Sequence, residues 1–250
     1  NLVEMGFFRK TYDINKIKAD KFLAYTHLGL GDHIVCNGLL NYFSESFDKI
    51  YLPVKSRDIN NINYLYKDNQ KIEVFKIEHS SEVEDINSFA KKNHLITLKV
   101  GFKKRKPPFN LSFYDQFGLP YSYSISKFTV PKDIKKEESL YKHLKDIYEV
   151  KDRYQVVHNQ SSYGKVSLHT NKELSTIFIE KDTDLYKNIF LYSKVIKNAT
   201  EIHCLDSSFL HLVERVETDA NLFFHNIKKD GQKGADVHLV KNWKIVNYFK

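Results

Sequence analysis

The chain has 250 residues, 42% of them hydrophobic and 28% charged, which is ordinary globular usage and excludes disorder over most of its length. No stretch approaches the length of apolar sequence that crosses a membrane, so we expect no transmembrane helix. The net charge of +8 suits an anionic partner such as a nucleotide, a phosphorylated glycan or an anionic membrane. Two cysteines, Cys36 and Cys204, are too few for a disulfide framework and favour a reducing compartment, for which we expect the cytoplasm.

Apolar runs of strand length alternate with segments of helical spacing in the first half of the chain. The predicted strands are 21–26, 48–54, 72–77 and 94–100, and the predicted helices are 34–43, 58–66 and 82–92. A basic run and an aromatic-rich stretch, 109–128, follow, and 133–150 is a predicted helix.

The second half repeats the alternation. We predict strands at 154–158, 174–180, 201–205 and 221–225, helices at 184–198 and 209–216, and a short strand or helix at 241–248. Strands that alternate with helices form parallel βαβ units. The predicted fold class is therefore α/β, with two Rossmann-like domains, 1–131 and 132–250, facing a central cleft.

A glycine turn joins the first predicted strand to the first predicted helix. Gly29 and Gly31 allow the backbone to turn tightly and to approach a ligand, and the helix that follows begins with free N–H groups. Asp32 is a candidate general base for a sugar hydroxyl, or it simply caps the helix. Its neighbour His33 is a weaker candidate for the same role.

Two segments of the second half are candidates for holding a phosphate or a ribose. His158, Ser161, Ser162 and Lys165 follow a predicted strand, in a loop that is otherwise a solvated connection. The second segment, Asp206, Ser207 and Ser208, lies at another junction of strand and helix, and His211 lies one turn further on. Its hydroxyls and backbone amides could bind a ligand, or the segment could be an ordinary helix cap.

Two further patterns admit simpler interpretations. Asp182 and Asp184 match a D-x-D pattern that binds a divalent metal in one class of glycosyltransferases, but a helix cap fits them better, so we expect no metal and no cofactor. The second pattern is a basic run of Lys103, Lys104, Arg105 and Lys106. It could contact phosphate groups, for example at the surface of a membrane, or it could be a solvated loop.

The combination of motifs resembles the heptosyltransferase-like group of GT-B glycosyltransferases. The stretch from His27 to Ile34, running into Asn37, is similar to the glycine-aspartate turn of that group, and the resemblance implies that Asp32 is the catalytic base. The stretch from Ala199 to Leu212 looks like the donor-site segment, with Ser207 and Ser208 in place of threonine and glycine. Residues 113–119 resemble a segment of small bacterial and viral glycosyltransferase-like proteins.

The resemblance implies an inverting, metal-independent transfer of a sugar from a nucleotide-sugar to a hydroxyl of a glycan or glycolipid. The N-terminal domain would hold the acceptor beside Gly29, Gly31 and Asn37, and the C-terminal domain would hold the donor. Two alternatives stay open: a non-catalytic nucleotide- or glycan-binding module, and a basic α/β protein that binds nucleic acid. We expect no specific nucleic-acid partner, because no nucleic-acid-binding module is recognisable.

Overall fold

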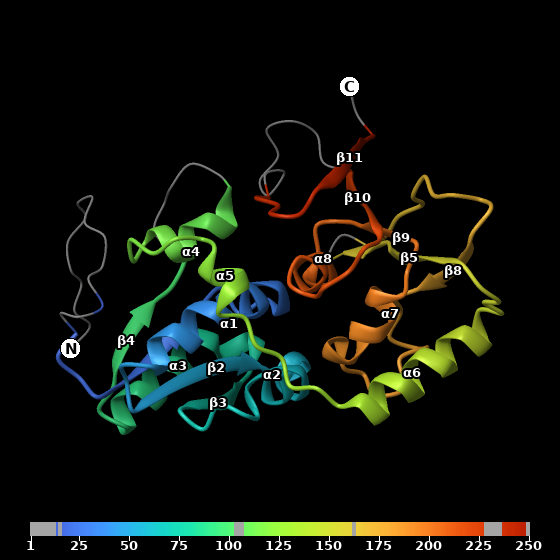
Figure 1. Ribbon diagram of the computed structural model, residues 1–250. Coiled ribbons are helices and arrows are strands. Elements are labelled where there is room, and N and C mark those ends of the chain that lie inside the picture. The colour runs from blue at the N-terminus through green and yellow to red at the C-terminus, as the bar shows by residue number, and fades with distance from the viewer. Residues whose placement is uncertain (1–13, 15–16, 103–107, 162–163, 228–236, 249–250) are drawn as a thin grey trace. The chain divides into compact units, whose positions relative to one another are not determined.

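The computed structural model describes residue 14 and residues 17–102, 108–161, 164–227 and 237–248. The chain divides into two compact units, Asn1–Pro131 and Lys132–Lys250 (Figure 1). Ser162 and the four basic residues of the run at 103–106 lie outside the described residues. Within the described part of the chain, no helix is long and apolar enough to cross a membrane.

The first unit is built on a four-stranded sheet in the order β3-β2-β1-β4, in which every neighbouring pair is parallel. Its strands are β1 (Lys21–Tyr25), β2 (Lys49–Lys55), β3 (Ile72–Ile77) and β4 (Ile96–Lys99). The chain steps outward from β1 to β3 and then crosses back to place β4 on the other side of β1. This is half of a doubly wound sheet, as the alternation in the sequence predicts.

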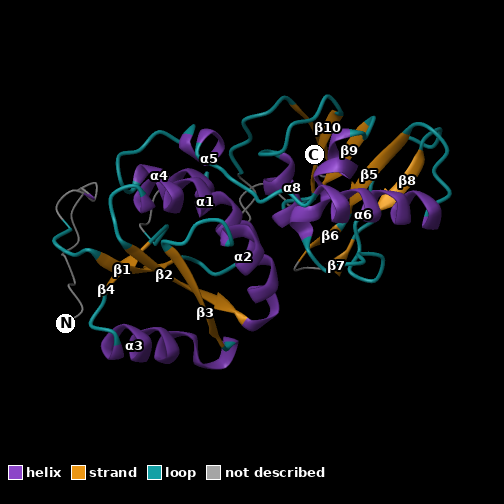
Figure 2. Cartoon of the chain, turned by 60° about the horizontal axis from the view of Figure 1, so that its bottom comes forward, coloured by secondary structure: helices purple, strands orange, loops and turns teal. Residues whose placement is uncertain are grey.

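Helices cover both faces of this sheet (Figure 2). The longer ones are α1 (Leu30–Ser44), α2 (Ile59–Tyr66) and α3 (Glu82–Lys92), and two single turns, α4 (Ser112–Asp115) and α5 (Tyr123–Ser126), lie in the aromatic stretch. Figure 2 shows α3 on one face of the sheet and α1 and α2 on the other. On α1, a Cβ atom at Gly38 would lie 2.2 Å from the carbonyl oxygen of Tyr123, so glycine is what allows α5 to pack this closely.

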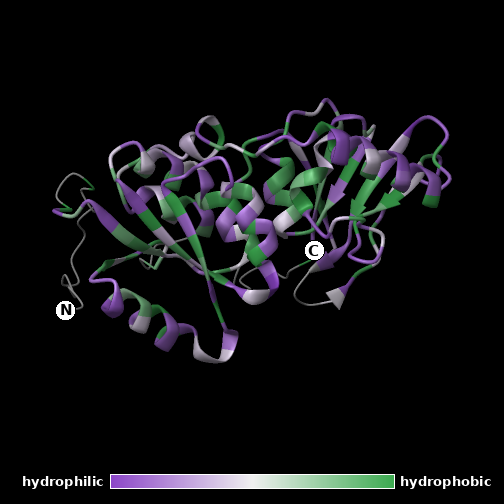
Figure 3. Cartoon of the chain, turned by 90° about the horizontal axis from the view of Figure 1, so that it is seen from below, coloured by the Kyte–Doolittle hydropathy of each residue, from purple (hydrophilic) through white to green (hydrophobic). Residues whose placement is uncertain are grey.

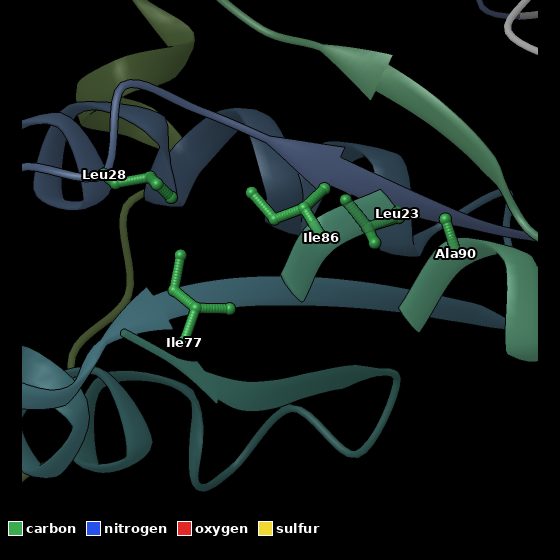
Figure 4. Packing of buried hydrophobic residues seen from close by; sticks show 5 residues of the cluster. All are labelled: Leu23, Leu28, Ile77, Ile86 and Ala90. Atoms are coloured by element: carbon green, nitrogen blue, oxygen red, sulfur yellow. The ribbon is translucent and has the colours of Figure 1, made fainter. Parts of the chain in front are cut away.

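Apolar residues from β1, β3 and α3 form a buried cluster under the first sheet (Figure 4). Leu23, Ile77 and Ile86 are at most 1% exposed, and Leu28 reaches into the same cluster from the turn after β1. The other residues of α3 are mostly hydrophilic, so the helix carries both purple and green segments in Figure 3. The cluster therefore fixes the turn after β1 by burying one of its side chains.

The second unit contains a five-stranded sheet in the order β11-β10-β9-β5-β8, again parallel throughout. Its strands are β5 (Tyr154–His158), β8 (Ser175–Phe178), β9 (Glu201–Cys204), β10 (Asn221–Asn226) and β11 (Trp243–Asn247), and its helices are α6 (Ile134–Ile147), α7 (Ser193–Lys197) and α8 (Ser208–Val213). A small antiparallel hairpin, β6 (Gln160–Ser161) with β7 (Gly164–Lys165), follows β5 and was not predicted.

The helix predicted at 184–198 is wrong over its first half. The Asp184 carboxylate accepts the backbone N–H groups of Tyr186 and Asn188, both at 2.9 Å, and Lys187 adopts a positive φ of 48°. These contacts close a turn that a continuing helix cannot contain. Helical structure begins only with the 3-10 turn Ile189–Tyr192, which leads into α7.

Candidate functional site

Each sheet has one place where the order of its strands reverses. In the first unit this switch point lies between β1 and β4, and in the second it lies between β5 and β9. In open α/β sheets, ligands bind beyond the carboxyl ends of the strands at such a point, because the two connections leave in opposite directions and open a crevice. The glycine turn follows β1, His158 ends β5, and Asp206 and Ser207 follow β9, so these predicted site residues all lie at switch points.

Asp32 lies in the first turn of α1 and is half-buried. Its Oδ2 accepts the backbone N–H of Gly29 at 3.1 Å, which caps the helix. The structure thus shows the capping role that the sequence allowed. A base role is compatible with it, because a cap contact of this kind holds the carboxylate in one place at the carboxyl end of β1.

The backbone of the turn before Asp32 is strained. Leu28 has φ of 63°, a left-handed conformation that is uncommon for a residue with a branched side chain, and its N–H donates to Thr26 Oγ1 at 3.2 Å. The complete burial of the Leu28 side chain holds this conformation in place. Backbone strain of about 1–3 kcal/mol is typical of ligand sites, where the surrounding structure over-determines the geometry.

Two residues predicted for this site are placed in the interior instead. His33 is 0% exposed, and within the described chain neither of its ring nitrogens has a hydrogen-bond partner, so it cannot reach a substrate hydroxyl. Burial, aided by the charge of Lys55, lowers the pKa of His33 to about 3. Asn37 is also 0% exposed, and its Oδ1 accepts the Thr129 N–H at 2.9 Å. Both side chains lie in the interior because α1 is buried on all sides from His33 to Leu40.

The switch point of the second unit brings together two predicted residues that are far apart in sequence. His158 Nδ1 lies 3.0 Å from Ser207 Oγ, and the His158 ring stacks on Phe209 with centroids 5.5 Å apart. Burial lowers the pKa of His158 to about 4, so the imidazole is neutral near pH 7. Ser207 also caps α8 by accepting the N–H of Leu210 at 3.4 Å.

The other predicted donor residues lie next to Ser207 in sequence, on α8, or in the hairpin after β5. Asp206 and Ser208 flank Ser207 and are half-buried. Burial and the nearby charge of Arg215 lower the pKa of His211 to about 4, against the opposite effect of Asp206. Lys165 lies on β7 and forms an ion pair with Glu180 at 2.5 Å, while Ser161 pairs with Gly164 through its backbone in the same hairpin.

Asp184 of the D-x-D segment has a structural role. Asp184 closes the turn before α7, and burial raises the pKa of its carboxyl. Among the described residues, no three or more His, Cys, Asp or Glu side chains are grouped so as to hold a metal ion.

An aromatic cluster at the first switch point was missed by the sequence analysis. The ring of His27, just after β1, stacks on Phe102, just after β4, with centroids 4.3 Å apart and 14° between the planes. Phe109 and Phe113 meet the same imidazole edge-on at 4.9 Å and 5.9 Å. The available signal was the spacing of Tyr25 and His27, which places two aromatic side chains on one face at the end of a strand.

A second missed feature is a chain of hydrogen bonds across β9 and β10. His203 Nε2 lies 3.3 Å from a Glu201 oxygen, His203 Nδ1 lies 2.9 Å from His225 Nε2, and His225 Nδ1 lies 2.8 Å from the Tyr248 hydroxyl. Because the Glu201 carboxylate only accepts, His203 Nε2–H donates to it. His225 Nε2–H then donates to His203 Nδ1, and the Tyr248 hydroxyl donates to His225 Nδ1. Both imidazoles are then neutral, and burial is the main reason that the pKa of each is lowered, that of His225 to about 4.

These buried histidines predict that the protein loses stability in mild acid. A histidine of the unfolded chain titrates near pH 6.5, whereas His33 and His225 stay neutral in the folded chain to about pH 3 and about pH 4. Below pH 6.5 the unfolded state therefore binds protons that the folded state does not. The free energy of unfolding should fall by about 1.4 kcal/mol per pH unit for each such histidine.

Denaturant titrations between pH 7 and pH 5 measure this slope. The variant His33→Leu should flatten it by the contribution of one proton, and His79→Leu, which changes an exposed histidine, should leave it as it is. An unchanged slope in His33→Leu would contradict the assignment of His33 as a buried neutral imidazole.

The chain resembles known proteins in its structure and not in its sequence. No protein-family model matches the chain, and no curated protein matches it by sequence. Among solved structures, the chain is similar to a glycosyl transferase family 9 protein from Veillonella parvula, with a TM-score of 0.58 and 10% identity over 92% of this chain and 87% of that one. It is also similar to the ADP-heptose LPS heptosyltransferase II of E. coli, with a TM-score of 0.51 and 7% identity over 90% of each chain.

The likeness spans nearly the whole chain and both units, so the α/β fold of two Rossmann-like units is that of a GT-B protein. One of the two structures is a heptosyltransferase, the kind of glycosyltransferase that the sequence motifs resemble.

Proposed function

We propose that the chain is a glycosyltransferase that moves a sugar from a nucleotide-sugar to a hydroxyl of a glycan or glycolipid acceptor. The observation that carries the proposal is the coincidence of two features. The fold resembles that of a glycosyl transferase family 9 protein over more than nine-tenths of the chain, and three of the polar residues predicted for the site, Asp32, His158 and Ser207, lie at the switch points of the two sheets.

In the proposed reaction, Asp32 acts as the general base in the first unit. The acceptor hydroxyl gives its proton to the Asp32 carboxylate while its oxygen forms a bond to the anomeric carbon. The bond from that carbon to the diphosphate oxygen breaks on the opposite side, and the electron pair leaves with the nucleoside diphosphate. One displacement of this kind inverts the anomeric configuration.

The second unit is proposed to hold the diphosphate through His158 and Ser207. Because Ser207 Oγ accepts the Leu210 N–H, its own hydrogen can go to His158 Nδ1. The neutral imidazole then carries its proton on Nε2, which is a donor for a phosphate oxygen. Together with the neighbouring Ser208, these donors would stabilise the leaving group without a metal ion.

The experiment is a transfer assay with a panel of nucleoside-diphosphate sugars and glycan acceptors, each with and without EDTA. We expect release of the nucleoside diphosphate matched by a new glycosidic bond of inverted configuration, at the same rate in EDTA. Binding of a donor without transfer to any acceptor would favour the non-catalytic module instead, and activity lost in EDTA would overturn metal independence.

A further inference from the structure

We infer that His27, Phe102 and Phe109 form a stacking platform for a pyranose ring of the acceptor, beside the candidate base. This inference rests on the proposed function, because the identity of the ligand as an acceptor sugar follows from sugar transfer. It adds to that function a binding subsite and the residues that recognise the ring.

The two phenylalanines are exposed although they belong to a packed cluster. Phe102 is 40% exposed and Phe109 is 43% exposed, while Phe113 beside them is fully buried. Single exposed apolar residues are ordinary, but here two exposed aromatic rings both lie against one half-buried imidazole, so their apolar surface gathers around His27. Such an area gains free energy when a ligand removes it from water.

The backbone that carries the platform is fixed from both sides. The Gly101 carbonyl accepts His27 Nε2–H at 2.8 Å, and the Gly101 N–H donates at 2.8 Å to Gln116 Oε1, whose side chain is 2% exposed. Gly101 has φ of 82°, and a Cβ there would lie 2.2 Å from the Phe113 ring. Rings placed by a fixed backbone bind a ligand without a large cost of ordering, which is what a recognition surface needs.

Polar groups border the aromatic surface. The Tyr25 ring meets Phe102 at 4.9 Å, and its hydroxyl donates to Glu82 at 2.9 Å. Glu82 also pairs with Lys55 at 3.2 Å, at the carboxyl end of β2. A pyranose has one or both faces lined with C–H groups and a rim of hydroxyls, so an aromatic surface with a charged hydrogen-bonding border fits it.

The position of the cluster favours an acceptor sugar over the nucleobase of the donor. The cluster joins the residues that follow β1 and β4, which are the two strands of the switch point in the first unit, and Asp32 lies five residues after His27 on the same turn. The residues proposed for the diphosphate belong to the other unit. A ring stacked next to the base is therefore the one whose hydroxyl is to be deprotonated.

The test has two arms, both on the full chain. In the first, saturation-transfer NMR measures binding of methyl glycosides of the common hexopyranoses, with uridine and adenosine as competing rings. We expect hexopyranoside signals that fall at least about fivefold in Phe102→Ala and Phe109→Ala, persist in Phe102→Trp, and persist in Ile134→Ala, which removes an exposed apolar side chain of the second unit.

In the second arm, the same variants are tested in the transfer assay, where each alanine variant should raise the KM for the acceptor about fivefold or more and leave the KM for the donor unchanged. If neither the native chain nor any variant transfers a sugar, but glycoside binding still depends on Phe102, the proposed function is rejected and the platform is retained. Unchanged glycoside binding and acceptor KM in both alanine variants, or nucleoside binding that depends on Phe102, would overturn the platform. Melting temperatures confirm that each variant is folded.

Discussion

Replacing Asp32 by Asn is expected to lower the rate of sugar transfer by about 10²–10⁴-fold, which is the usual contribution of a general base. The amide cannot accept the proton of the acceptor hydroxyl at neutral pH. Its carbonyl oxygen can still accept the Gly29 N–H that caps α1, so the helix should begin at the same residue. The measurement is the rate of nucleoside diphosphate release at saturating donor, with a thermal melt to compare stability.

The matched control is Asp85→Asn in the first turn of α3. Asp85 is also a capping aspartate of the first unit, accepting the Glu78 N–H at 3.0 Å and the Ser81 hydroxyl at 2.9 Å. Its helix follows β3, the edge strand farthest from the switch point, and an amide oxygen can accept the same two contacts, so the replacement should leave the rate unchanged. A folded Asp32→Asn protein that keeps full transfer activity would remove the base assignment.

Replacing Glu214 by Ala is expected to lower the free energy of unfolding by about 3 kcal/mol or more. The Glu214 carboxylate is 2% exposed and accepts three N–H groups: those of Val240 at 2.6 Å, of Lys241 at 3.1 Å and of the Trp243 indole at 2.6 Å. These contacts tie the segment before β11 to the end of α8. Alanine would leave all three donors without their acceptor.

Trp243 is the only tryptophan of the chain, so its fluorescence follows unfolding of the second unit in guanidinium, with circular dichroism as a second probe. Glu217→Ala is the matched control: Glu217 is highly exposed, and its ion pair with Lys197 lies in solvent, where such pairs contribute little. Equal stability losses in the two variants would contradict the account of Glu214 as a buried anchor.

The strands could be predicted from sequence because their signals are local. The segments 72–77 and 154–158 are rich in β-branched and aromatic residues, and the structure has strands there with the same bounds. The prediction of a helix at 184–198 is wrong over its first half because the apolar spacing begins in a segment whose backbone is held in a turn. The Asp184 carboxylate holds a turn by bonding to nearby amides, and hydrophobic periodicity does not report such contacts.

The site was predicted in parts and not as a whole. His158 and Ser207 were each singled out, but their 3.0 Å contact depends on β5 pairing directly with β9, which no local pattern specifies. His33 and Asn37 were singled out by their place near the glycine turn, yet both are buried because α1 is covered on all sides over this stretch, which the sequence of the helix alone does not reveal. The aromatic platform was missed because Phe102 meets His27 only through the pairing of β1 with β4.

The most direct test of the account is binding of nucleoside diphosphates and their sugar conjugates in EDTA, measured by thermal shift and calorimetry on the purified chain and on the His158→Phe variant. The account predicts that one nucleoside diphosphate stabilises the native chain, by about 2.7 kcal/mol at 100 times its dissociation constant, and that the variant binds it at least tenfold more weakly. Absence of a shift with every nucleotide, or a shift that is the same in His158→Phe, would contradict a donor site at the switch point between β5 and β9.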